Sequence, residues 1–247
     1  MSSWGLANRM KIADGIAMLE LDLGRMVLCP TVLFNQDTWI LVDTGMPGNA
    51  PAIIELAKQE GIGNQKLDTI LLTHQDIDHI GGLPAFIGNP VVYAHEDDKE
   101  VINGKQPLLK VPAERMTRLL ASMSVELRSQ FEAAFIHPTR ANVDRTMEDG
   151  ETLPFAGGVK VIHTPGHTPG HVSLYHMASK TLIAGDSMVI KDGELRVPRE
   201  EVTPNMKQAL QSLKKYKDFD IANVICYHGG LLQGDINSMI AALTEQG

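Results

Sequence analysis

Short apolar stretches alternate with polar turns through the first quarter of the chain, and this pattern predicts β-strands. The stretches occupy residues 15–21, 27–34 and 38–42. Only Asn35-Gln36-Asp37 separates the second stretch from the third, and so short a polar connection favours a β-hairpin. The chain is therefore expected to begin with strands, two of which pair directly.

The pattern then changes to a helical one and back. Between residues 51 and 61 apolar side chains recur at helical spacing, and Gly61 is a typical helix stop. Residues 69–73 form a short apolar run that predicts a strand buried on both faces. Further along, the same patterns predict strands at residues 91–94, 159–163, 172–176, 181–184 and 223–227, a hairpin at 188–197, and helices at 113–135, 203–217 and 236–243.

In both halves of the chain, the predicted elements run from strands to a helix and back to a strand. The chain has no internal repeat, no low-complexity tract and no obvious linker, and 247 residues suffice for one sizeable domain with a hydrophobic core. We therefore predict a single α/β domain over residues 1–247, with a helical insertion at residues 97–140.

Composition narrows the classes of partner. The chain has 22 Lys and Arg against 30 Asp and Glu, a formal net charge of −8, whereas nucleic-acid binding needs clustered basic residues. No apolar run approaches a membrane span, the first twenty residues lack the core of a secretory signal, and Cys29 and Cys226 form no disulfide framework. We expect a cytoplasmic protein, monomer or homodimer, that acts on a small-molecule substrate and binds neither nucleic acid nor membrane.

Candidate chemistry begins directly after the short apolar strand, where the chain reads Thr-His-Gln-Asp-Ile-Asp-His. This places His74, Asp76, Asp78 and His79 within six positions. Alternation along an extended segment puts positions 74, 76 and 78 on one side, and the turn that follows can bring position 79 toward them. A solvated polar loop is the alternative, but so many His and Asp side chains would repel or titrate unless a cation held them. The segment therefore predicts a metal site.

Further His and Asp residues follow other predicted strands. In His163-Thr-Pro-Gly-His167-Thr-Pro-Gly-His171, Pro and Gly predict a rigid turn that projects an imidazole from the sheet edge. Asp186 follows the strand end Leu-Ile-Ala-Gly, and His228 precedes two glycines. Each of these is a weak signal alone, and together they indicate one centre.

In this order the motifs resemble those of the metallo-β-lactamase fold superfamily. The five segments that carry the resemblance are Val42-Asp43-Thr44-Gly45, residues 73–79, Thr164-Pro165-Gly166-His167-Thr168, Gly185-Asp186 and Tyr227-His228-Gly229. They span nearly the whole chain. The resemblance implies a four-layer αββα sandwich with its site at one edge of the two sheets.

The resemblance also implies a dinuclear centre of two divalent metal ions, Zn, Fe or Mn. It assigns His74, Asp76 and His167 to the first ion, Asp78, His79 and His228 to the second, Asp186 as the bridge between them, and Asp43 as the carboxylate that orients a ligating imidazole. His163 and His171 are then expected to support the turn or the ligands. His95, His137 and His176 are expected to be structural or exposed.

Position 76 departs from the family, which usually has His there, so the motif is an HxDxDH variant. A carboxylate is a harder ligand than imidazole and shifts preference from Zn²⁺ toward Fe or Mn. A carboxylate also ligates iron at this point in the flavodiiron branch, where it is Glu. The shorter Asp76 either binds its metal directly, which we favour, or reaches it through water.

Two such ions lower the pKa of a bridging water and polarise a carbonyl or phosphoryl oxygen. The resemblance therefore implies a metallo-hydrolase that uses a metal-bound hydroxide on a lactone, ester, thioester or phosphodiester, with Asp78 as the catalytic proton carrier. Asp186 stands where true β-lactamases have Cys or Ser, and Val189 where the lactone-hydrolysing branch has Tyr. The alternative is a non-haem iron oxidoreductase, flavodiiron-like or persulfide dioxygenase-like.

The insertion carries an apolar stripe with two interpretations. Its apolar positions are Met116, Leu119, Leu120, Met123, Leu127 and Phe131. Amphipathic stripes usually pack on a core, which is the first interpretation. The second is an adaptable apolar lid over the metals, with Met123 among its residues.

Overall fold

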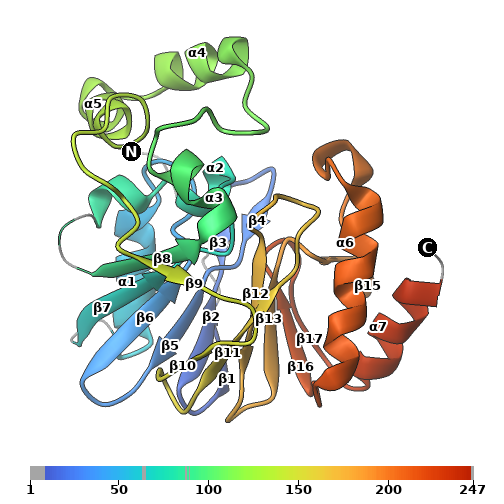
Figure 1. Cartoon of the computed structure of the whole chain (residues 1–247). Helices are drawn as coiled ribbons and strands as arrows, with labels where there is room; N and C mark the ends of the chain where they lie inside the picture. Colours follow the sequence, from blue (N-terminus) through green and yellow to red (C-terminus); the bar gives the residue numbers. More distant parts are fainter. Residues whose placement is uncertain (1–8, 63–64, 87, 89, 246–247) are drawn as a thin grey trace.

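The computed structural model describes residues 9–62, 65–86, 88 and 90–245. Two β-sheets pack face to face, and helices cover both outer faces (Figure 1). The chain is thus an α/β protein with the four-layer αββα arrangement that its motifs predict.

The first sheet contains seven strands in the described residues. In spatial order they are β1 (Arg9–Ala13), β2 (Ile16–Leu19), β5 (Thr31–Phe34), β6 (Thr38–Val42), β7 (Lys66–Leu71), β8 (Val91–His95) and β9 (Arg145–Met147). β5 and β6 are antiparallel, with Thr31 opposite Val42, which confirms the predicted hairpin. From β6 to β9 the strands are parallel, so their carboxyl ends lie at one edge of the sheet.

The second sheet repeats this arrangement in part. Its order is β10 (Thr152–Leu153), β11 (Val159–His163), β12 (Val172–His176), β13 (Thr181–Gly185), β16 (Asn223–Cys226) and β17 (Gly230–Gln233). β13 and β16 are parallel, and β11 runs in the same direction because both β11 and β13 are antiparallel to β12. The carboxyl ends of β11, β13 and β16 therefore share an edge.

Short elements complete the fold. Two hairpins pair β3 (Leu21–Asp22) with β4 (Val27–Leu28) and β14 (Val189–Lys191) with β15 (Glu194–Arg196). The helices are α1 (Ala50–Gln59), α2 (Ile77–Ile80), α3 (Glu96–Ile102), α4 (Ala113–Ser122), α5 (Val125–Phe135), α6 (Met206–Leu213) and α7 (Ile236–Glu245), with 3₁₀ turns at Leu83–Ala85, Glu200–Val202 and Lys214–Asp218. None of these described helices has the length and apolar character needed to cross a bilayer.

Two of the predicted helices differ from the observed ones. The stretch at residues 113–135 is two helices, because Ser124 leaves helical geometry and its side chain caps α5 by accepting a hydrogen bond from the Leu127 amide at 3.2 Å. The helix predicted at 203–217 starts at Met206 and tightens to a 3₁₀ turn after Leu213. Local capping and turn chemistry thus set boundaries that the apolar spacing does not reveal.

The apolar core has three parts, one between the sheets and one beneath each helical layer. Phe131 of α5 is fully buried, and its ring lies 4.9 Å from that of Phe135. Met116 and Met123 are partly buried against the same cluster. The stripe of the insertion therefore packs on the core, as the first interpretation expects.

Candidate metal centre

The strands β7, β11, β13 and β16 all end at one edge of the sandwich. The segments that follow these strands carry all seven predicted ligands. The structure brings the seven together in two groups, which are His74, Asp76, His167 and Asp186, and Asp78, His79 and His228. Within each group one potential ligand atom of every residue lies within 4.8 Å of the others.

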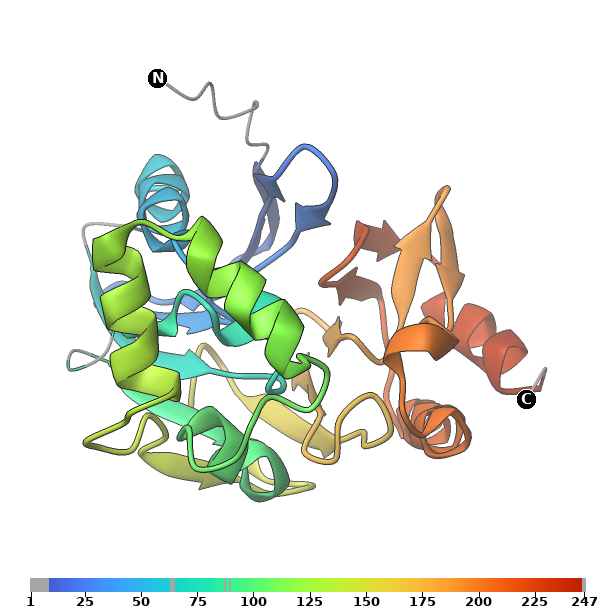
Figure 2. The ribbon, with the colours of Figure 1, turned by 90° about the horizontal axis from the view of Figure 1, so that it is seen from above.

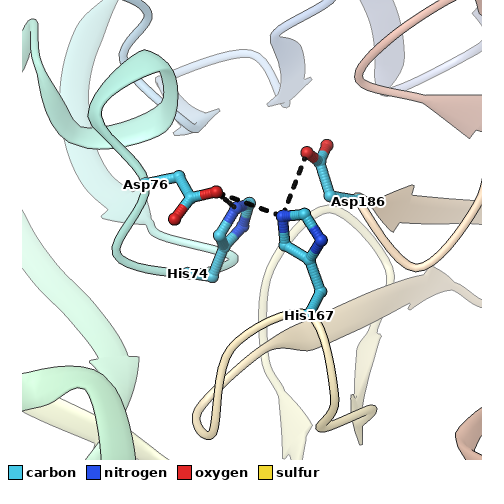
Figure 3. A group of neighbouring side chains, drawn as sticks. All are labelled: His74, Asp76, His167 and Asp186. Atoms are coloured by element: carbon cyan, nitrogen blue, oxygen red, sulfur yellow. Dashed lines mark hydrogen bonds and ion pairs between the residues drawn. The ribbon is translucent and has the colours of Figure 1, made fainter. Parts of the chain in front are cut away.

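The first group surrounds a single point (Figure 3). Asp76 Oδ2 lies 3.4 Å from His74 Nε2 and 3.1 Å from His167 Nε2, and His167 Nε2 lies 3.4 Å from Asp186 Oδ2. Tetrahedral coordination with bonds of about 2.0–2.1 Å separates ligand atoms by roughly 3.3 Å. The spacing of the first group fits a metal of this kind.

The second group is continuous with the first through Asp186. His228 Nε2 lies 3.2 Å from Asp78 Oδ2 and 3.4 Å from Asp186 Oδ2, and His79 Nε2 lies 3.4 Å from Asp186 Oδ1. Asp186 therefore contacts imidazoles of both groups, which is the position expected of a bridging ligand.

Hydrogen bonds orient the two imidazoles of the HxDxDH segment. Asp43 Oδ2 lies 2.8 Å from His79 Nδ1 and accepts the hydroxyl hydrogen of Thr73 at 2.7 Å. Thr73 Oγ1, having donated its hydrogen, then accepts from His74 Nδ1 at 3.0 Å. In their neutral form both imidazoles carry their hydrogen on Nδ1, which leaves the lone pair of each Nε2 toward the centre. Asp43 has φ of 62°, a strained conformation typical of functional sites, and its hydrogen bonds agree with the orienting role that the family resemblance implies for it.

His167 is oriented in the same way. Thr203 Oγ1 donates to the Arg199 carbonyl at 2.8 Å and therefore accepts from His167 Nδ1 at 3.2 Å. His167 Nε2 thus carries a free lone pair as well. Three imidazoles are fixed with their Nε2 atoms as acceptors.

Several atoms at the centre have no protein partner. His74 Nε2, His79 Nε2 and Asp186 Oδ1 are buried, and none of them has a hydrogen-bond partner among the described residues. Unpaired buried polar atoms are costly, so three of them at one point require an explanation. A divalent cation accepts all three lone pairs, and the donor set therefore fits a metal.

The electrostatics of the centre also favour a cation. Burial alone would raise the pKa of Asp186, but His228 and His79 hold it well below its usual range. Burial would lower the pKa of His228, but Asp186 and Asp78 raise it to about 10. The carboxylates are therefore ionised at neutral pH and stabilise positive charge between them.

His171 supports the bridging residue instead of joining the ligands. Its Nε2 accepts the Asp186 amide hydrogen at 2.9 Å, and its Nδ1 lies 2.8 Å from Thr164 Oγ1. Burial followed by the nearby His74 holds the pKa of His171 well below its usual value, so the ring stays neutral. Gly185, with φ of 57°, makes this approach possible, because a Cβ there would lie 2.7 Å from His171 Nε2.

Asp98 of α3 joins the two loops of the site and was not singled out by the sequence. Its fully buried carboxylate accepts from the amide and side chain of Gln75 at 3.0 Å each, from Thr168 Oγ1 at 2.7 Å and from the Gly170 amide at 2.8 Å. One carboxylate thus ties the HxDxDH segment to the His167 loop. Its position as the third of three consecutive acidic residues after β8 was the only signal of it in the sequence.

Two further residues contact the ligands, Tyr227 of the fifth motif and Lys110, which belongs to none of the motifs. The Tyr227 hydroxyl donates to the Asp78 carbonyl at 2.6 Å, and the tyrosine ring packs 3.8 Å from the His79 ring. Lys110 Nζ lies 2.6 Å from both Asp76 Oδ2 and His167 Nε2. Nothing in the sequence around Lys110 indicates this contact.

Another His and Asp group lies outside the centre. His95, Asp97 and His163 approach one another, and the two imidazoles stack with centroids 3.8 Å apart and planes 14° apart. Imidazole lone pairs lie in the ring plane, so two nearly parallel stacked rings do not converge on one cation. We assign this group no metal.

A cavity of about 580 Å³ opens over the centre. Asp76, Asp78, Asp186, His167 and His228 are part of its lining. The segment at residues 97–140 and the β14–β15 hairpin lie on opposite sides of this edge when the molecule is seen from above (Figure 2). The rest of the lining is Arg25, Met26, Val27, Met46, Ile77, Leu108, Lys110, Val111, Arg115, Val189, Ile190, Lys191, Pro198, Arg199, Val202 and Gly229.

Comparison with known proteins agrees with this fold. Residues 27–228 match the family model of the metallo-beta-lactamase superfamily. The chain belongs to the metallo-β-lactamase superfamily, as its five motifs predict.

The relatives include hydrolases. The chain is 29% identical over 206 residues to the probable metallo-hydrolase YflN of Bacillus subtilis, covering 78% of this chain and 75% of the relative. It is 25% identical over 244 residues to an N-acyl homoserine lactonase of Bacillus thuringiensis, covering 84% and 86%. The crystal structure of the metallo-beta-lactamase family protein TTHA1429 from Thermus thermophilus superposes with a TM-score of 0.69 at 25% identity, covering 96% of this chain and 80% of that one. Its family and its hydrolase relatives identify the protein as a metal-dependent hydrolase.

Proposed function

We propose that this protein hydrolyses an ester or thioester that combines an apolar acyl group with an anionic group. The observation that carries the hydrolytic part is the convergence of seven His and Asp side chains, five of which line one cavity, with Asp186 in contact with both groups. A divalent ion held by these residues supplies Lewis acidity and lowers the pKa of a bound water.

The chain's own residues divide the remaining tasks. Asp78 lines the cavity beside His228 and is placed to take the proton of the attacking water and return it to the leaving group. Asp43 and Thr73 keep the imidazoles of the HxDxDH segment in one orientation throughout. Val189 provides no hydroxyl at the position where the lactonase branch has Tyr, which favours open-chain esters over lactones.

The cavity lining supports the substrate class. Apolar side chains from three segments, among them Val27, Val111 and Ile190, offer a surface for an acyl group, and each buried methylene contributes about 0.8 kcal/mol. Arg25, Arg115, Lys191 and Arg199 also line it, and within the described part of the chain none of these four forms an ion pair with an acidic side chain. Four unpaired cations on a protein of net charge −8 favour an anionic substrate.

The test uses two esters with the same acyl group, one with a neutral leaving group and one with a carboxylate on it. We expect chelator treatment to abolish hydrolysis of both and reloading with Zn²⁺ or Mn²⁺ to restore it. We also expect kcat/KM for the anionic ester to exceed that for the neutral one by about tenfold or more, since two charges about 4 Å apart near a surface interact by a few kcal/mol.

Arg115 and Arg118 provide the matched control, because both are exposed on α4 but only Arg115 lines the cavity. Arg115→Gln should reduce the preference for the anionic ester, and Arg118→Gln should leave it unchanged. Hydrolysis that persists after complete metal removal would contradict the hydrolytic proposal. Equal kcat/KM values for the two esters would contradict the substrate class alone.

A further inference from the structure

Lys110 enters the first group of candidate ligands from the segment between α3 and α4. Its Nζ lies 2.6 Å from Asp76 Oδ2 and 2.6 Å from His167 Nε2, and its side chain is only 15% exposed. These are two of the four ligand atoms of that group. In the described part of the chain, no lysine or arginine pairs with Asp78 of the second group or with Asp186, which contacts both groups.

The contact with His167 uses the only lone pair that this imidazole offers. Its Nδ1 donates to Thr203, so Nε2 is the acceptor and the Lys110 ammonium is the donor. One nitrogen lone pair binds either an N–H group or a metal ion. Lys110 and an ion in the first group therefore exclude each other at His167.

The contact with Asp76 explains why the ammonium lies there. Asp76 Oδ2 and His167 Nε2 are both acceptors and are 3.1 Å apart, so they repel unless a positive group lies between or beside them. Lys110 donates to both. A carboxylate at position 76 supplies the full negative charge that attracts a lysine, which a neutral imidazole would not supply.

We propose that the Lys110 ammonium takes the place of a metal ion in the first group. The protein then binds one divalent ion tightly, through Asp78, His79, His228 and Asp186. It binds a second ion only in competition with Lys110. This inference rests on the proposed metal centre and deepens it, because it assigns the two positions unequal affinities.

The test is the number of ions bound, independent of activity. Chelator-treated protein is titrated with Zn²⁺ by calorimetry, and its zinc content is measured after gel filtration. The wild-type protein should retain one ion per chain. Lys110→Leu should retain two, with the affinity for the second ion raised by about tenfold or more, because a positive charge next to that position is removed.

Lys105→Leu is the matched control. Lys105 lies in the same segment but is exposed and pairs with Glu100 at 3.0 Å, so its loss should leave one retained ion. Folding of each variant is checked by circular dichroism.

Two equally tight ions in the wild-type protein would overturn the inference, and this result does not depend on any variant folding. A folded Lys110→Leu protein that still retains one ion would overturn it as well. If the wild-type protein shows two equal sites and metal-dependent hydrolysis, only the role of Lys110 fails. If it binds no ion, the proposed function fails together with the inference.

Discussion

Replacing Asp186 by Asn is expected to lower kcat/KM by more than about 100-fold and to release bound metal. The carboxylate contacts His79 through Oδ1 and both His167 and His228 through Oδ2. An Asn side chain has the same shape but only one acceptor oxygen, so one of the two positions would face an NH₂ group. Even residues that only orient metal ligands change affinity by about 10–100-fold when mutated, and a shared ligand should cost more.

Asp192→Asn is the control for this substitution. Asp192 is exposed in the β14–β15 turn and has φ of 56°, a conformation that Asn adopts as readily as Asp. Activity and metal content should stay at wild-type values in this variant. If Asp186→Asn retained wild-type metal content and kcat/KM, the bridging role would be wrong.

Asp98→Asn is expected to produce the largest loss of stability, about 3 kcal/mol in the free energy of unfolding. Each Asp98 oxygen accepts a backbone amide hydrogen, Oδ2 from Gln75 and Oδ1 from Gly170. Whichever way the Asn amide turns, its NH₂ group faces a backbone N–H that cannot move away. The loss can be measured by urea unfolding.

The same substitution should also weaken metal binding, because Asp98 ties the HxDxDH segment to the His167 loop. Asp97→Asn is the control, since Asp97 is the exposed neighbour of Asp98 on α3. A loss below about 1 kcal/mol for Asp98→Asn would show that the carboxylate does not hold the two loops together.

The fold was predictable where local sequence patterns decide it. The hairpin of β5 and β6 follows from a polar connection between two apolar runs, and the order of strands and helices agrees with the four-layer architecture. Strand β17 and the split between α4 and α5 were not predicted. A short strand that begins with the second of two glycines has little pattern of its own, and the cap at Ser124 interrupts a stripe whose apolar spacing continues through it.

The candidate site was also predictable only in part. Metal ligation requires particular side chains, and in this chain they occur in the segments that follow strands, so His74, Asp186 and His228 are visible as motifs in the sequence. Lys110 and Asp98 act through contacts with residues 34 and 23 positions away in the chain, and only the folded arrangement creates those contacts. The composition argued against polyanionic partners such as nucleic acid, yet the fold places several exposed cations around one cavity, which net charge does not reveal.

The position of a bound metal tests the central claim most directly. Crystals grown with Zn²⁺ would be measured on both sides of the zinc absorption edge, so that anomalous differences locate the ion. The account predicts a peak about 2.0–2.2 Å from His79 Nε2, His228 Nε2 and a carboxylate oxygen of Asp186. Well-ordered side chains at these positions with no anomalous peak between them, at a zinc concentration that supports hydrolysis, would contradict it.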